Sequence, residues 1–163
     1  MRKLFSIICI LLLLLSACSA NPVNEATEPA GQLQLANPWK GYPSMADAEA
    51  ASGLDFPLPE TIADIYTAEV FRVMNGSLME VIYKNDESEI TVRMQGGADQ
   101  DISGVYENFQ HTETTEQNGA AITRKQTADC LVYLIHLDSY SFSIYASSLA
   151  ADDACHEILS YIC

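Results

Sequence analysis

Three oxygen-bearing side chains, Asp99, Asp101 and Ser103, alternate along the chain and precede Gly104. This pattern matches the first half of a calcium-binding loop, in which alternating oxygen ligands are followed by a glycine at a sharp turn. The twelfth position of such a loop is Gln110 rather than glutamate, so the usual bidentate ligand is missing. We therefore predict at most a weak calcium site at these three residues. The alternative is a polar loop between two strands.

The cysteines and histidines do not cluster in the sequence. There is no Cys-x-x-Cys and no His-Glu-x-x-His, and Cys155 and His156 are neighbours that point about 100° apart on a helix. Cys130 and His136 lie six residues apart on one expected strand, which separates them by about 20 Å. There is also no Gly-x-Ser-x-Gly nucleophile turn. These patterns favour a protein that is not an enzyme and has no cofactor.

The first 17 residues have the pattern of a secretory signal peptide. Arg2 and Lys3 are basic, residues 4–15 are almost all apolar, and Ser16 and Ala17 are small. The apolar run is shorter than the roughly 20 residues that cross a bilayer. We therefore expect residues 1–17 to direct export and then to be removed.

The last three residues of this region and the residue that follows it, Leu15-Ser16-Ala17-Cys18, resemble the bacterial lipobox. The resemblance implies a diacylglyceryl group on the Cys18 sulfur and cleavage before that residue. Two acyl chains anchor a protein stably, whereas one anchors it only marginally. We predict a lipoprotein on the extracytoplasmic face of the cell membrane. The alternative is a secreted protein in which Cys18 lies near the cleavage site by chance.

The mature chain is strongly acidic. It keeps all 22 acidic residues and loses Arg2 and Lys3, so six positive charges face 22 negative ones, a formal charge of −16. Such a surface repels phosphate backbones and anionic lipid headgroups. We therefore expect no nucleic-acid partner, and contact with the membrane only through the covalent anchor.

Three cysteines of the mature chain remain as disulfide candidates: Cys130, Cys155 and Cys163. An odd number in an exported protein permits one disulfide with one free thiol, or no disulfide. The sequence leaves both possibilities open.

Composition divides the mature chain into a tether and a domain. Residues 18–36 contain prolines, glycine and glutamates with few large apolar residues, which is typical of a flexible tether spanning roughly 20–25 Å. Residues 37–163 are expected to form one domain. Trp39, the only tryptophan, is expected at the edge of that domain.

The domain begins with a short helix and continues mainly as strands. Ser44 and Asp47 predict the helix start and Gly53 its end. Asn75-Gly76 and Asn118-Gly119 predict two hairpins. Alternation or apolar runs predict strands at 66–74, 78–84, 90–94, 111–116, 120–126, 130–137 and 140–146.

The chain ends in an amphipathic helix. Ser147 or Ser148 is expected to cap it, and one apolar stripe contains Ala151, Cys155, Ile158 and Ile162. We therefore predict an α+β domain: a curved antiparallel sheet of about six or seven strands, with the C-terminal helix on one face and a short N-terminal helix.

Several segments resemble known families. Asn37-Pro38-Trp39, residues 51–60 and residues 101–106 look like small lipoproteins of gut Firmicutes, and residues 140–162 are similar to the end of the DUF4367 domain. That domain is thought to resemble the curved sheets of LolA and RseB. Typical members have tryptophan shortly after the Ile-Ser-Gly segment, where this chain has Phe109. The resemblance implies no catalytic residues, and implies a concave face that holds an acyl chain or senses an envelope protein.

These observations together predict a non-catalytic binding or envelope-sensing module. Its partner would be an envelope protein, a glycan or a lipid. One alternative is a structural protein stabilised by weakly bound calcium. Another is an enzyme acting on cell-wall or dietary polymers, which would need two acidic side chains at catalytic spacing in a cleft.

Overall fold

The computed structural model describes residues 37–97, 100–137 and 139–163. One compact unit runs from Asn37 to Cys163. The predicted signal peptide, the tether with Cys18, and Asp99 lie outside the described residues. None of the described helices is long and apolar enough to span a membrane.

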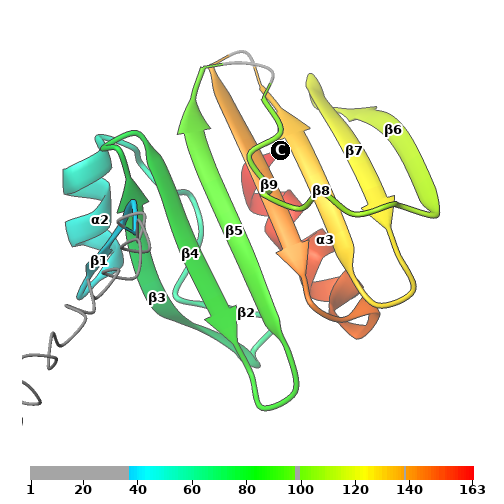
Figure 1. Ribbon diagram of the computed structural model, residues 1–163, viewed down its shortest axis with the longest axis horizontal. Coiled ribbons are helices and arrows are strands. Elements are labelled where there is room, and N and C mark those ends of the chain that lie inside the picture. The colour runs from blue at the N-terminus through cyan, green and yellow to red at the C-terminus, as the bar shows by residue number, and fades with distance from the viewer. Residues whose placement is uncertain (1–36, 98–99, 138) are drawn as a thin grey trace, which may run out of the picture. The chain divides into compact units, whose positions relative to one another are not determined.

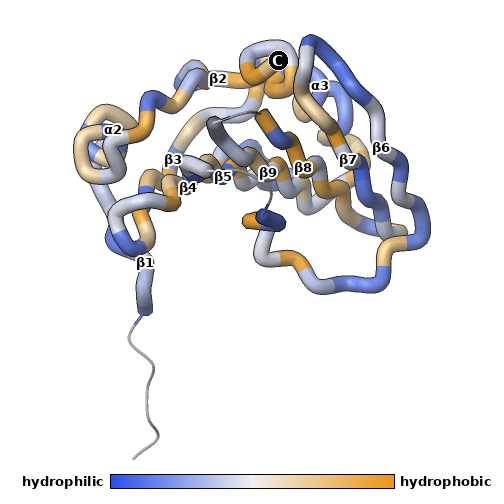
Figure 2. Tube along the Cα trace, turned by 90° about the horizontal axis from the view of Figure 1, so that it is seen from above, coloured by the Kyte–Doolittle hydropathy of each residue, from blue (hydrophilic) through white to orange (hydrophobic). Residues whose placement is uncertain are grey.

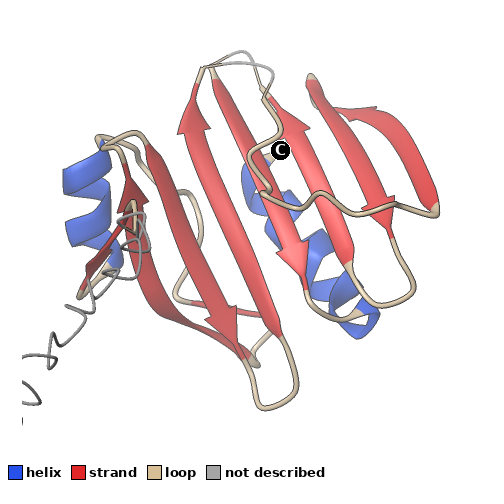
Figure 3. Cartoon of the chain, viewed as in Figure 1, coloured by secondary structure: helices blue, strands red, loops and turns tan. Residues whose placement is uncertain are grey.

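The domain is built on one antiparallel sheet of nine strands, in the order β1-β3-β4-β5-β9-β8-β7-β6 with β2 also pairing β3 (Figure 1). Figure 3 shows the helices α2 (Met45–Ser52) and α3 (Asp152–Ile162), drawn in blue, beside this sheet. The α+β class is therefore confirmed. The strands are β1 (Trp39–Tyr42), β2 (Thr61–Ile62), β3 (Tyr66–Met74), β4 (Leu78–Lys84), β5 (Glu89–Gly96), β6 (His111–Gln117), β7 (Ala120–Gln126), β8 (Leu131–His136) and β9 (Tyr140–Ala146).

The predicted count of six or seven strands is wrong, because β1 and β2 were missed. Both are short, and they pair with opposite halves of the same edge of β3. Neither shows the alternation that reveals a longer strand. The free edge of β3 supplies their hydrogen-bond partners. Because this pairing depends on the neighbouring strand, the side chains of such a short segment do not predict it.

Both predicted Asn-Gly turns are present and connect hairpins β3–β4 and β6–β7. Asn75 and Gly76 have φ values of 53° and 67°, and Asn118 and Gly119 have 51° and 85°. Two successive positive φ values match the right-handed twist of the flanking strands. The β6–β7 hairpin lies at one end of the sheet.

The two helices begin and end at recognisable caps. Helix α2 (Met45–Ser52) follows Ser44, whose side chain accepts a hydrogen bond from the Asp47 amide, and ends at Gly53 with φ of 70°. Helix α3 (Asp152–Ile162) begins later than predicted, because Ser148 caps a preceding 3₁₀ turn, η1 (Leu149–Ala151). Ser147 instead bonds to the backbone of Glu89.

The sheet curves around α3, and the core fills the space between them (Figure 2). The predicted stripe of α3 faces this core: Ala151, Cys155 and Ile158 are buried, and Ile162 packs against the cluster. The sheet contributes β-branched and aromatic side chains from β4, β5, β9 and β8 to the same cluster. The concave face of the sheet is thus occupied by the protein's own core.

A polar contact also holds α3 against the sheet. The Tyr133 hydroxyl donates to Asp152 Oδ1 over 2.5 Å, and Arg124 Nη2 donates to Asp152 Oδ2 over 3.1 Å. Burial, together with the bond to Asp152, raises the pKa of the Tyr133 hydroxyl. The hydroxyl therefore remains a donor, and the first turn of α3 is tied to β7 and β8.

The opposite, convex face is crossed by the connection between β5 and β6. We call its residues 100–110 the crossing segment. Figure 1 shows it running over β9, β8 and β7, and Figure 2 shows it on the side of the sheet away from α3. Ile102 and Ser103 within the segment are buried, as are Ser141 and Ser143 of β9 on this face. The convex face is therefore partly covered by polar as well as apolar contacts.

Candidate functional site

A buried carboxylate lies on the convex face between two arginines. Glu80 of β4 is 0% exposed and stands directly opposite Arg72 of β3 and Arg93 of β5 in the strand register. Both arginines donate from Nε to its carboxylate, Arg93 over 2.7 Å. Two cations share one anion here, so the cluster keeps a local excess of one positive charge.

Trp39 of β1 lies over this cluster. The centroid of its ring is 5.1 Å from Cζ of Arg72 and 5.5 Å from Cζ of Arg93. Guanidinium groups bind the faces of indole rings in this range. The edge strand β1, of only four residues, therefore places the only tryptophan of the chain against arginine side chains from two other strands.

Arg93 also fixes the crossing segment to the sheet. Its Nη1 donates to the carbonyl oxygens of Ile102, over 3.0 Å, and Ser103. Gly104 follows with φ of 68°, and a Cβ at that residue would lie 2.6 Å from Arg93 Nη1. Only glycine allows the backbone and the guanidinium to approach so closely.

A hollow of about 340 Å³ opens between Trp39 and the crossing segment. Tyr106 stands at this hollow and is 91% exposed, the highest exposure among the large hydrophobic side chains of the described residues. The hollow is lined by Trp39, Met74, Leu78, Arg93, Asp101, Ile102, Gly104 and Tyr106. Its walls therefore combine two aromatic rings with aliphatic and charged groups.

The structure shows other partners for the residues of the predicted calcium site. Asp101 Oδ1 accepts from the amide and hydroxyl of Ser103, and its Oδ2 accepts from Lys125 Nζ over 3.0 Å. Burial alone would raise the pKa of Asp101, but the bonds from Ser103 and Lys125 outweigh it and lower that pKa. No group of three or more metal-binding side chains occurs among the described residues, which exclude Asp99. The calcium site stays a prediction.

The three disulfide candidates are free thiols in the structure. Cys155 lies in the core beneath the concave face, whereas Cys130 is within 3.9 Å of Glu107 in the crossing segment on the other face. Cys155 and Cys163 are eight residues apart along α3, about 12 Å at the helical rise. A disulfide requires Cα atoms within about 7 Å, so this arrangement joins neither pair.

The two thiols of α3 should differ in reactivity. Burial raises the pKa of Cys155 to about 12, and it raises that of the half-buried Cys163 less. Because the thiolate is the nucleophile, a pulse of iodoacetamide on the native chain at pH 8 should modify Cys163 and leave Cys155 intact. Peptide mapping by mass spectrometry measures both. Equal modification before unfolding in urea would contradict the packing of α3.

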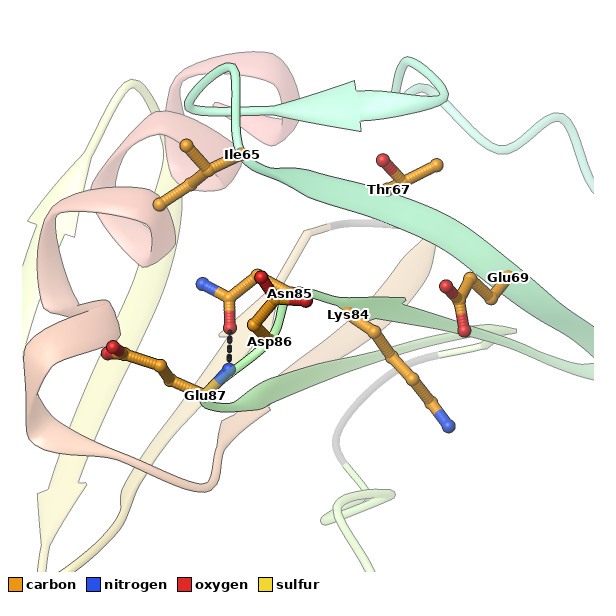
Figure 4. Close-up of a pocket in the computed structure, with 7 residues that line it drawn as sticks. All are labelled: Ile65, Thr67, Glu69, Lys84, Asn85, Asp86 and Glu87. Carbon is orange, nitrogen blue, oxygen red and sulfur yellow. Dashed lines mark hydrogen bonds between the residues drawn. The ribbon is translucent and has the colours of Figure 1, made fainter.

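A larger hollow of about 730 Å³ lies at the far end of β3 and β4. Figure 4 shows Glu69 and Glu87 at opposite ends of it, with Asp86 and Lys84 between them. Asn85 Oδ1 accepts a hydrogen bond from the Glu87 amide over 3.0 Å, which belongs to the β4–β5 turn. The exposed acidic side chains do not converge as a pair of catalytic carboxylates must.

The sequence analysis missed Trp39, Arg72, Glu80, Arg93 and Tyr106 as site residues. The pairing of Glu80 with Arg72 did not follow from the Asn75-Gly76 turn, because three residues rather than two separate the paired Met74 and Leu78. The approach of Trp39 was not predictable, since it depends on the unrecognised strand β1. Tyr106 carried no pattern that distinguishes it from a loop residue.

No family model matches this chain, and comparisons with curated proteins and with solved structures find no match either. The resemblance of residues 140–162 to the DUF4367 domain stays a prediction. Any function must therefore be argued from the residues and their geometry.

Proposed function

We propose that this chain is a lipoprotein, anchored by Cys18 on the extracytoplasmic face of the cell membrane, whose domain is a non-catalytic binding module. The observation that carries the anchor is the order Leu15-Ser16-Ala17-Cys18 after a basic and apolar leader. The observation that supports binding is the hollow between Trp39 and Tyr106.

The hollow has the size of a small-molecule site, and its walls mix apolar and polar groups. Such sites are usually 300–1,000 Å³, mainly apolar, and carry a few placed polar groups. Here Met74 and Leu78 supply apolar surface, and the Arg93 guanidinium is held in place by Glu80. Exposed aromatic side chains such as Tyr106 are enriched where proteins bind partners.

The proposal places binding on the convex face. A LolA-like or RseB-like function would place an acyl chain or a partner on the concave face, but the core and α3 occupy that face. We therefore keep the envelope location and the binding role that the resemblance implies, but we place the binding surface on the convex face rather than the concave face.

Replacing the anchoring residue tests the location. In cells grown with radioactive palmitate, the native chain should be labelled and should sediment with membranes. Cys18→Ser should lose all label, because no thiol remains at the cleavage site to carry the acyl chains. Cys9→Ser, within the apolar leader, is the matched control and should retain both properties. A labelled Cys18→Ser chain, or an unlabelled native chain, would refute the anchor.

A further inference from the structure

We propose that the hollow between Trp39 and Tyr106 binds an uncharged oligosaccharide. This inference rests on the proposed binding function and adds the chemical class of the ligand. It follows from the pairing of the charges that line the hollow and from its two aromatic rings, of which Tyr106 is exposed and Trp39 is partly buried.

Both charged residues that line the hollow already have opposite charges beside them. Arg93 pairs with the buried Glu80 over 2.7 Å, and Asp101 pairs with Lys125 over 3.0 Å. An ionic ligand would have to compete with these protein partners. Arg72 and Arg93 hold one positive charge in excess over Glu80, but the acidic surface of the whole mature chain outweighs it and repels an anion during approach. An uncharged ligand meets neither obstacle.

The two rings offer surface and hydrogen-bonding groups together. Within the described residues, neither the indole N–H of Trp39 nor the hydroxyl of Tyr106 has a hydrogen-bond partner, although the Trp39 backbone amide bonds to Asn37. Tryptophan and tyrosine side chains suit ligands that have an apolar surface on one side and hydrated polar groups on another. A sugar ring fits this description, because its faces carry C–H groups and its rim carries hydroxyls.

The main competitor is an apolar peptide segment. Met74 and Leu78 give the hollow some apolar surface, but its polar and apolar walls are mixed and it is open to water on one side. Burying a purely apolar segment there would take water away from Arg93 Nη2, which has no hydrogen-bond partner within the described residues, and this costs free energy. Hydroxyl groups can supply the missing bond.

The single tryptophan makes the site directly measurable. The full chain, purified in a polyoxyethylene detergent to avoid sugar headgroups, is titrated with cellotetraose, maltotetraose, chitotetraose, mannotetraose and galactotetraose while Trp39 emission is recorded. We expect at least one of them to shift the emission saturably, with a dissociation constant in the range of about 1 mM or below. Tyr106→Ala should weaken that binding about tenfold or more, as loss of a stacking ring does.

Tyr161→Ala is the matched control, because Tyr161 is an exposed tyrosine of α3 on the other side of the sheet. It should leave the titration unchanged. The inference is overturned if no uncharged tetrasaccharide shifts the emission up to about 10 mM. It is also overturned if tetragalacturonate binds more tightly than galactotetraose, or if Tyr106→Ala has no effect. None of these results bears on palmitate labelling, so the anchor is tested separately.

Discussion

Replacing Glu80 by glutamine should lower the free energy of unfolding by about 3–5 kcal/mol, as expected when one partner of a buried ion pair is removed. The carboxylate is 0% exposed and accepts from both Arg72 and Arg93. Glutamine keeps the volume but has one carbonyl oxygen and no charge. Arg93, only 18% exposed, would then be left without a counterion.

Urea unfolding of the full chain, followed by circular dichroism, measures this loss. Glu116→Gln is the matched control, because Glu116 is exposed on the edge strand β6 and should change stability by less than about 0.5 kcal/mol. Of the two variants, only Glu80→Gln should also shift the Trp39 emission, since both guanidinium groups near the ring lose the carboxylate that holds them in place. Equal stability of the two variants would mean that the pairing contributes nothing net.

The sequence predicted the parts of the fold that local rules determine. The two Asn-Gly turns, the cap at Ser44 and the glycine stop at Gly53 each depend on a few neighbouring residues, and all were confirmed. The buried stripe of α3 was predictable for the same reason, because helical periodicity assigns its face without knowledge of the partner.

The site escaped prediction because it joins elements that are distant in the chain. Trp39 reaches Arg93 only after β1, β3, β4 and β5 have paired in register. The Asp101–Ser103 pattern was noticed, but as cation ligands. The carbonyl oxygens of Ile102 and Ser103 accept hydrogen bonds from Arg93, a contact that the sequence did not predict, and the calcium site itself stays a prediction.

Replacing Gly104 by alanine should destabilise the domain more than the same change at Gly76. The two glycines have nearly equal φ values, 68° and 67°, so an added Cβ costs about 1–2 kcal/mol at either residue. At Gly76 nothing lies within 4 Å of that Cβ, whereas at Gly104 Arg93 Nη1 lies at 2.6 Å. Hydrogen bonds to charged groups contribute about 1.5–3 kcal/mol, and displacing the guanidinium weakens those to Ile102 and Ser103.

We therefore expect Gly104→Ala to cost about 2 kcal/mol more than Gly76→Ala in urea unfolding, because only Gly104 presses on a bonded side chain. A double-mutant cycle identifies the cause. In an Arg93→Ala background the clash is absent, so the two alanine substitutions should cost the same. An excess that persists without Arg93 would show that the crossing segment is strained by its own backbone. In that case the Arg93 guanidinium would not be the group that holds the crossing segment on the sheet beside Trp39.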